Sequence, residues 1–144
     1  MSEAAEPWHL MPVAILAVLW NLAGCADYVM TQYSVAPYLK LFTQSQAEYF
    51  TSVPALVDAA WAVGVWFGLA GAVLLFLRLG VAPLILGLSA LSMLATATWL
   101  IVFATPPLGA VAGPFGVFMI STASAMAVLF YFFARTMRVS GALS

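Results

Sequence analysis

Charged side chains are scarce in this chain. The 144 residues include four Lys or Arg and five Asp or Glu, which is 6% of the total. A soluble domain carries roughly 25% charged residues, and with 65% hydrophobic residues this chain could not cover itself with polar surface in water. We therefore expect membrane lipids around it. The net charge of −1 also excludes the basic surface that nucleic-acid binding requires.

The residues that carry most enzyme chemistry are nearly absent. His9 is the only histidine and Cys25 the only cysteine, which excludes bis-histidine haem ligation, an internal disulfide and a recognisable zinc set. Serine and threonine have no histidine partner for nucleophilic catalysis. We expect no enzyme activity, no catalytic residue, no metal site and no cofactor. Residues 1–9 lack a basic region and a cleavage site, so we expect a retained first helix.

Long hydrophobic runs are what the sequence does contain. A membrane-spanning helix needs about 20 mainly apolar residues, and four segments meet that requirement. Prolines stand near the first turns, where a missing N–H costs little. The sequence predicts an all-α integral membrane protein, a four-transmembrane-helix bundle forming a single domain over 1–144. The predicted spans cover residues 12–33, 55–77, 81–104 and 112–134.

The connection between the first two spans, residues 34–53, mixes aromatic and polar side chains. This pattern favours a short amphipathic segment that lies in the membrane interface. A plain surface loop is the alternative.

Basic residues indicate the orientation. Arg78, Arg135 and Arg138 fall on one side of a four-span protein and Lys40 falls on the other. The positive-inside rule then predicts a multi-pass protein with both termini in the cytoplasm and the connection outside.

Small residues recur every fourth position in the second span, at Ala60, Gly64, Gly68 and Ala72. Such a ridge lets helix backbones approach closely. It could pack within one chain or form the seam of a homo-oligomer, and the sequence leaves both open.

Asp27 is the residue most costly to place in lipid, at roughly 2.5–3.5 kcal/mol for an aspartate at a helix centre. It lies about six residues, or about 9 Å, from the outer end of the first span. Asn21 lies deeper, near the predicted midplane. Such residues usually face a bundle interior or a wet cavity. We therefore take Asp27 and Asn21 as candidate ligand-binding residues.

Antiparallel neighbours would bring four more side chains to the same outer half. The candidate binding residues are Asn21, Asp27, Tyr28, Asp58, Trp61 and Trp99. Carboxylates beside aromatic rings suit polyhydroxylated or cationic ligands. The alternatives are an aromatic belt at the interface, a helix N-terminal acid at Asp58, and an aspartate whose hydrogen bond only fixes helix packing.

Two stretches, residues 19–30 (LWNLAGCADYVM) and residues 49–66 (from Tyr49-Phe50 to Val65-Trp66), carry a family resemblance. With them the chain resembles small four-span bacterial inner-membrane proteins that are labelled as candidate sugar transporters and look like distant relatives of the DoxX-type bundle. The resemblance covers the first two spans, while the last two agree only in hydropathy. It implies a bacterial inner membrane and a small-solute role, and it transfers no binding residues.

Two functions follow as hypotheses. In the first, the protein binds or transports a small molecule through an outer-half pocket with Asp27 and Asp58, and transport would require a homo-oligomer joined at the glycine ridge. In the second, it is an accessory subunit or assembly factor that packs against a larger membrane complex. Beyond membrane lipids, the sequence identifies neither the ligand nor a protein partner.

Overall fold

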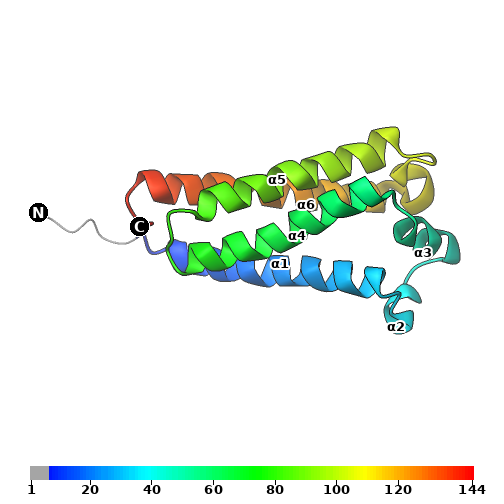
Figure 1. Cartoon of the computed structure of the whole chain (residues 1–144), viewed down its shortest axis with the longest axis horizontal. Coiled ribbons are helices and arrows are strands. Elements are labelled where there is room, and N and C mark those ends of the chain that lie inside the picture. Colours follow the sequence, from blue (N-terminus) through cyan, green and yellow to red (C-terminus); the bar gives the residue numbers. More distant parts are fainter. Residues whose placement is uncertain (1–6) are drawn as a thin grey trace, which may run out of the picture.

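Four long helices dominate the computed structural model, which describes residues 7–144. Figure 1 shows them side by side along one axis, with two short helices at one end. We call this the connection end, and the opposite end, where the C-terminus and the start of α1 lie, the terminal end. The elements are α1 Leu10–Gln32, α2 Ala36–Leu39, α3 Gln44–Thr51, α4 Ala55–Phe76, α5 Ala82–Thr98, the π-helix η1 Trp99–Phe103, and α6 Leu108–Val139.

The predicted fold class is confirmed. Four helices, with α5 and η1 counted as one, are long and apolar enough to cross a membrane. Their bounds agree with the predicted spans to within a few residues, except at α6. The predicted connection contains the short helices α2 and α3, and α3 begins with a capping box in which Thr43 and Gln46 satisfy each other's backbone N–H groups.

The bundle is an arc rather than an evenly closed ring. Helix α4 packs against both α1 and α5, and α5 packs against α6. The backbones of α1 and α6 come close only at isolated points. At the terminal end both helices contribute to one buried cluster, which includes Leu10 and Ala14 of α1 and Phe130 and Ala134 of α6.

The small-residue ridge lets α4 pack closely against its neighbours α1 and α5. Gly64 lies against Met93 of α5, Gly68 against Asn21 and Ser89, and Gly71 against Leu86. A Cβ atom at Gly71 would stand 2.6 Å from Leu86 Cγ, closer than carbon atoms pack. Gly64, Gly68 and Ala72 are buried and Ala60 is half-buried. The ridge is therefore covered within one chain, so it is not free to be the seam between two copies.

Helix α6 begins four residues before the predicted span, at Leu108, and ends five residues after it, at Val139. A kink divides this helix. Gly113 has φ 69° and ψ −169°, outside the helical region. Pro114 causes this: its ring disfavours a helical residue before it, and it has no N–H to donate. Gln46 of α3 donates to the carbonyl of Val111 (3.3 Å), which ties the short first part of α6 to the connection.

Candidate functional site

Asp27 lies in the connection-end half of α1 and is half-buried. Its carboxylate accepts a hydrogen bond from the hydroxyl of Tyr38, in the short helix α2. Burial, and then the bond to Asp27, raise the pKa of Tyr38 well above its ordinary value. The connection thus folds back over α1 and supplies a neutral donor to the most costly side chain of the span.

Asp58 lies in the first turn of α4, where the helix dipole favours an acid. Its carboxylate accepts a hydrogen bond of 2.6 Å from Gln32 Nε2, at the last residue of α1. The Tyr28 hydroxyl also interacts with Asp58, and the Tyr28 ring meets Trp61 edge to face with centroids 4.9 Å apart. The structure therefore gathers Tyr28, Asp58 and Trp61, together with Gln32, between α1 and α4.

The two carboxylates are held by different partners. Asp27 is held by α2, and Asp58 by α1. Both accept from neutral donors, so a hydroxyl or ammonium group of a ligand would replace a neutral hydrogen bond rather than an ion pair. This hydrogen-bonded group of Asp27, Tyr38, Gln32 and Asp58 we call the polar layer.

Asn21 lies apart from the polar layer, nearer the middle of α1. Its Nδ2 donates to the Ala17 carbonyl (2.8 Å), and it borders a cavity of about 50 Å³ between the four long helices. Beside it, Ser89 donates to the Gly64 carbonyl (2.6 Å), and Cys25 Sγ donates to that of Val65 (3.2 Å). The Ser89 bond joins α5 to α4, and the Cys25 bond joins α1 to α4.

Trp99 does not join Tyr28 and Trp61. It begins the π-helix η1, in which the Ala104 N–H reaches the Trp99 carbonyl (2.8 Å), and no ring contact of Trp99 occurs within residues 7–144. Of the six candidate residues, three are therefore brought together, while Asp27, Asn21 and Trp99 stand at separate places. Whether any of them binds a ligand stays a prediction.

Sequence reasoning missed the tyrosines of the connection as polar partners. In the sequence Tyr38 is one of several aromatic side chains in the connection, and nothing in the pattern singles it out as the donor to Asp27, eleven positions earlier. Tyr49 of α3 has a buried hydroxyl oxygen with no hydrogen-bond partner in the part of the chain described. Burial raises the pKa of Tyr49.

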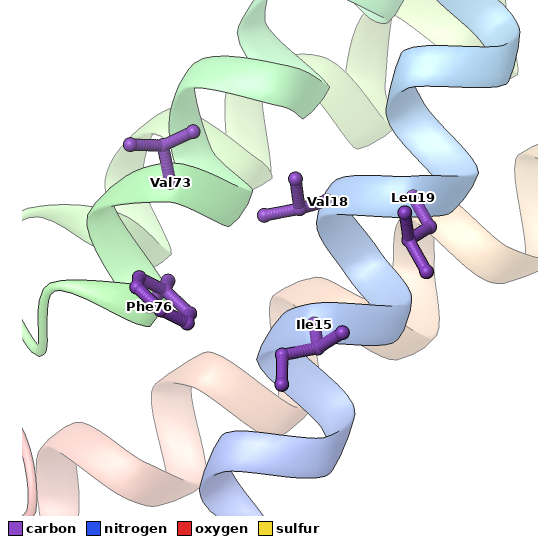
Figure 2. A pocket seen from close by; sticks show the side chains of 5 residues that line it. All are labelled: Ile15, Val18, Leu19, Val73 and Phe76. Carbon is purple, nitrogen blue, oxygen red and sulfur yellow. The ribbon is translucent and has the colours of Figure 1, made fainter.

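An apolar groove of about 190 Å³ lies between α1 and α4 near the terminal end. Figure 2 shows its lining of aliphatic and phenyl side chains, from Ile15, Val18 and Leu19 on α1 and from Val73 and Phe76 on α4. Without a polar group it offers nothing to recognise a solute, and a lipid tail would fill it in a membrane.

Within the described residues, no three His, Cys, Asp or Glu side chains gather in a way that could hold a metal ion. Comparison with family models, with curated proteins and with solved structures finds no match to this chain.

Proposed function

We propose that the protein binds or transports a small molecule in the membrane, with the polar layer as its recognition and closing element. One observation carries the proposal: the carboxylate inside a membrane span, Asp27, is bonded to Tyr38, which belongs to a separate four-residue helix. A partner on a short connection can withdraw without unpacking the bundle. A partner on a neighbouring long helix could not.

The described conformation would be the closed one. The cavity below the polar layer has about 50 Å³, room for a few water molecules and too small for a sugar. Entry of a solute would need Tyr38 to leave Asp27. The carboxylates would then accept hydrogen bonds from a polyhydroxylated solute or pair with a cation, and Trp61 and Tyr28 would offer ring faces.

The proposal includes an orientation. Arg78 follows α4, and Arg135 and Arg138 lie in the last turns of α6, all at the terminal end, whereas Lys40 follows α2 at the connection end. By the positive-inside rule the termini face the cytoplasm of a bacterial cell and the polar layer faces outward.

Thermal unfolding of the purified protein against a panel of sugars and organic cations, at two pH values, tests the proposal. A compound that binds the folded state raises the midpoint, by mass action. We expect such a rise in the wild type, its loss in Asp27→Asn, and its persistence in Thr136→Val, which removes an exposed hydroxyl bonded only within α6. If no compound shifts the wild type while Asp27→Asn is merely less stable, the carboxylate is structural and the proposal fails.

One observation favours the second function, an accessory subunit of a larger membrane complex. Ser121 and Ala125 lie one turn apart on α6 and both are exposed, so a small-residue face remains uncovered in this chain. Small faces are where membrane helices associate. Cysteine crosslinking from Ala125→Cys in cells, followed by identification of the captured protein, would distinguish a larger partner from a second copy of the chain.

A further inference from the structure

A partly open cavity of about 50 Å³ lies between the four long helices, near the middle of the bundle. Most of its wall is made of small side chains, and no charged residue lines it. Its polar groups come from Asn21 and Ser89. The lining residues are Trp20, Asn21, Gly24, Gly64, Val65, Ser89, Met93, Ala123 and Ala127.

The polar groups have unused hydrogen-bonding capacity. An asparagine amide has two N–H donors and a carbonyl acceptor. Within residues 7–144, Asn21 Nδ2 donates to the Ala17 carbonyl and Oδ1 lies against Gly68 of α4, so the second N–H is the donor that remains. Ser89 is 2% exposed and donates its proton to Gly64, which leaves its oxygen free to accept. The cavity can therefore both donate to and accept from one small neutral group.

We infer that the cavity opens between α1 and α6. Its walls include α1 residues and α6 residues, and these two helices come close only at isolated points. Trp20, on the α1 side, is 36% exposed and sits in the middle of its span, whereas tryptophans in membrane proteins gather at the interfaces. Gly24, Ala123 and Ala127 leave room beside it. A molecule dissolved in the bilayer can approach the cavity there.

We propose that this cavity binds the polar end of a neutral lipophile, a hydrocarbon chain ending in a single hydroxyl or carbonyl group. The end group bonds to Asn21 and Ser89, and the chain leaves between α1 and α6. The small volume admits the end group alone, and the absence of a charged lining residue disfavours an ionic headgroup. This site goes beyond the proposed function: it lies in the cavity below the polar layer, but it uses neither Asp27 nor any other residue of that layer and is entered from the lipid.

Photolabelling with a diazirine-bearing dodecanol tests the site, on full-length protein in detergent, with labelled peptides mapped by mass spectrometry. We expect labelling near Trp20 to Gly24 and near Ala123 to Ala127. Excess 1-dodecanol should displace the label, and dodecane, which lacks the hydroxyl, should not. Asn21→Leu removes one hydrogen bond and should weaken displacement by 1-dodecanol about tenfold.

Three variants that replace an alanine by leucine keep the test decisive even if Asn21→Leu does not fold. Ala123→Leu and Ala127→Leu fill the cavity and should abolish labelling at these peptides. Ala125→Leu adds the same volume to an exposed position of the same helix and should leave it unchanged. Labelling that dodecane displaces equally well, or that survives both filling variants, would reveal only lipid contact and overturn the site. Asp27→Asn should not affect the labelling, so this result and that of the solute panel are independent.

Discussion

Three polar residues of the bundle, Asp27, Asp58 and Ser89, each have a hydrogen-bond partner on a neighbouring element. Asp27 accepts a hydrogen bond from Tyr38, Asp58 accepts one from Gln32, and Ser89 donates to the Gly64 carbonyl. A buried polar group without a partner costs a few kcal/mol in an apolar medium, so pairing is what allows these residues to remain in the bundle. The pairing of Asp27 is distinctive because its partner belongs to the connection rather than to a packed helix.

Replacing Tyr38 by phenylalanine should lower the free energy of unfolding by about 1–3 kcal/mol at neutral pH, because it leaves the Asp27 carboxyl without its donor. Tyr33→Phe is the matched control, since Tyr33 is 80% exposed and makes no side-chain hydrogen bond in the described chain. Denaturant unfolding in mixed micelles measures both. Equal stability of Tyr38→Phe and the wild type would contradict the bond.

The same bond predicts a pH dependence. Burial and the bond to Asp27 raise the pKa of Tyr38 in the folded protein above its ordinary value of 10.0. A raised folded pKa means that the folded state keeps a proton that the unfolded state loses. The stabilisation is therefore complete below pH 10 and declines as the pH rises beyond it. Above pH 10 the unfolding free energy of the wild type should fall more steeply with pH than that of Tyr38→Phe. If the two unfolding free energies fall in parallel, the prediction is wrong.

At the scale of whole elements, the sequence predicts length well and partners poorly. The number of spans follows from the requirement for about 20 apolar residues, which is local. The kink in α6 was within reach of the same reasoning, because Gly113-Pro114 is a known helix breaker. What the sequence could not show is that the first turn before the kink, from Leu108, would still be helical and attached to α3 through Gln46.

The candidate site was harder to predict because it depends on how the connection folds back. Tyr28 and Gln32 are four residues apart and so lie on one face of α1. The structure puts that face against Trp61 and Asp58 of α4. Periodicity within one helix cannot say that α2 would bring Tyr38 to Asp27. Nor does it show that the π-helical turn at Trp99 would begin where α5 ends, away from the other aromatic rings.

Packing of α4 on α5 should depend on the absence of a side chain at Gly71. A Cβ atom there would stand 2.6 Å from Leu86 Cγ and 3.1 Å from the Leu86 backbone nitrogen, so Gly71→Ala must push the helices apart. We expect a loss of about 1–3 kcal/mol in unfolding free energy. Gly24→Ala is the control, because its Cβ would lie 3.6 Å from Val65 Cγ1, an ordinary contact, and should not destabilise.

At the scale of the whole molecule, the two ends of the bundle are built differently. The terminal end is closed by a buried apolar cluster from α1, α4, α5 and α6, and the C-terminal Ser144 bonds back to the backbone of Arg78 and Gly80. The connection end is held by side-chain hydrogen bonds of the polar layer. Apolar packing fixes a shape, whereas hydrogen bonds can be exchanged for bonds to a ligand. Movement should therefore be confined to the connection end.

Because only the connection end is expected to move, the orientation of the protein decides which side of the membrane supplies the ligand. Labelling of single cysteines measures that orientation. In a Cys25→Ala background, Ser45→Cys of α3 and Val139→Cys at the end of α6 both place a thiol at an exposed position. With the termini in the cytoplasm, a membrane-impermeant maleimide added to intact bacterial cells should label Ser45→Cys and should reach Val139→Cys only after permeabilisation. The reverse pattern would put the polar layer inside the cell, and a solute site there would open toward the cytoplasm. Three predicted crossings, α4, α5 with η1, and α6, separate Ser45 from Val139. Labelling of both positions in intact cells would mean that these helices do not all cross the membrane, and the positive-inside assignment would lose its basis.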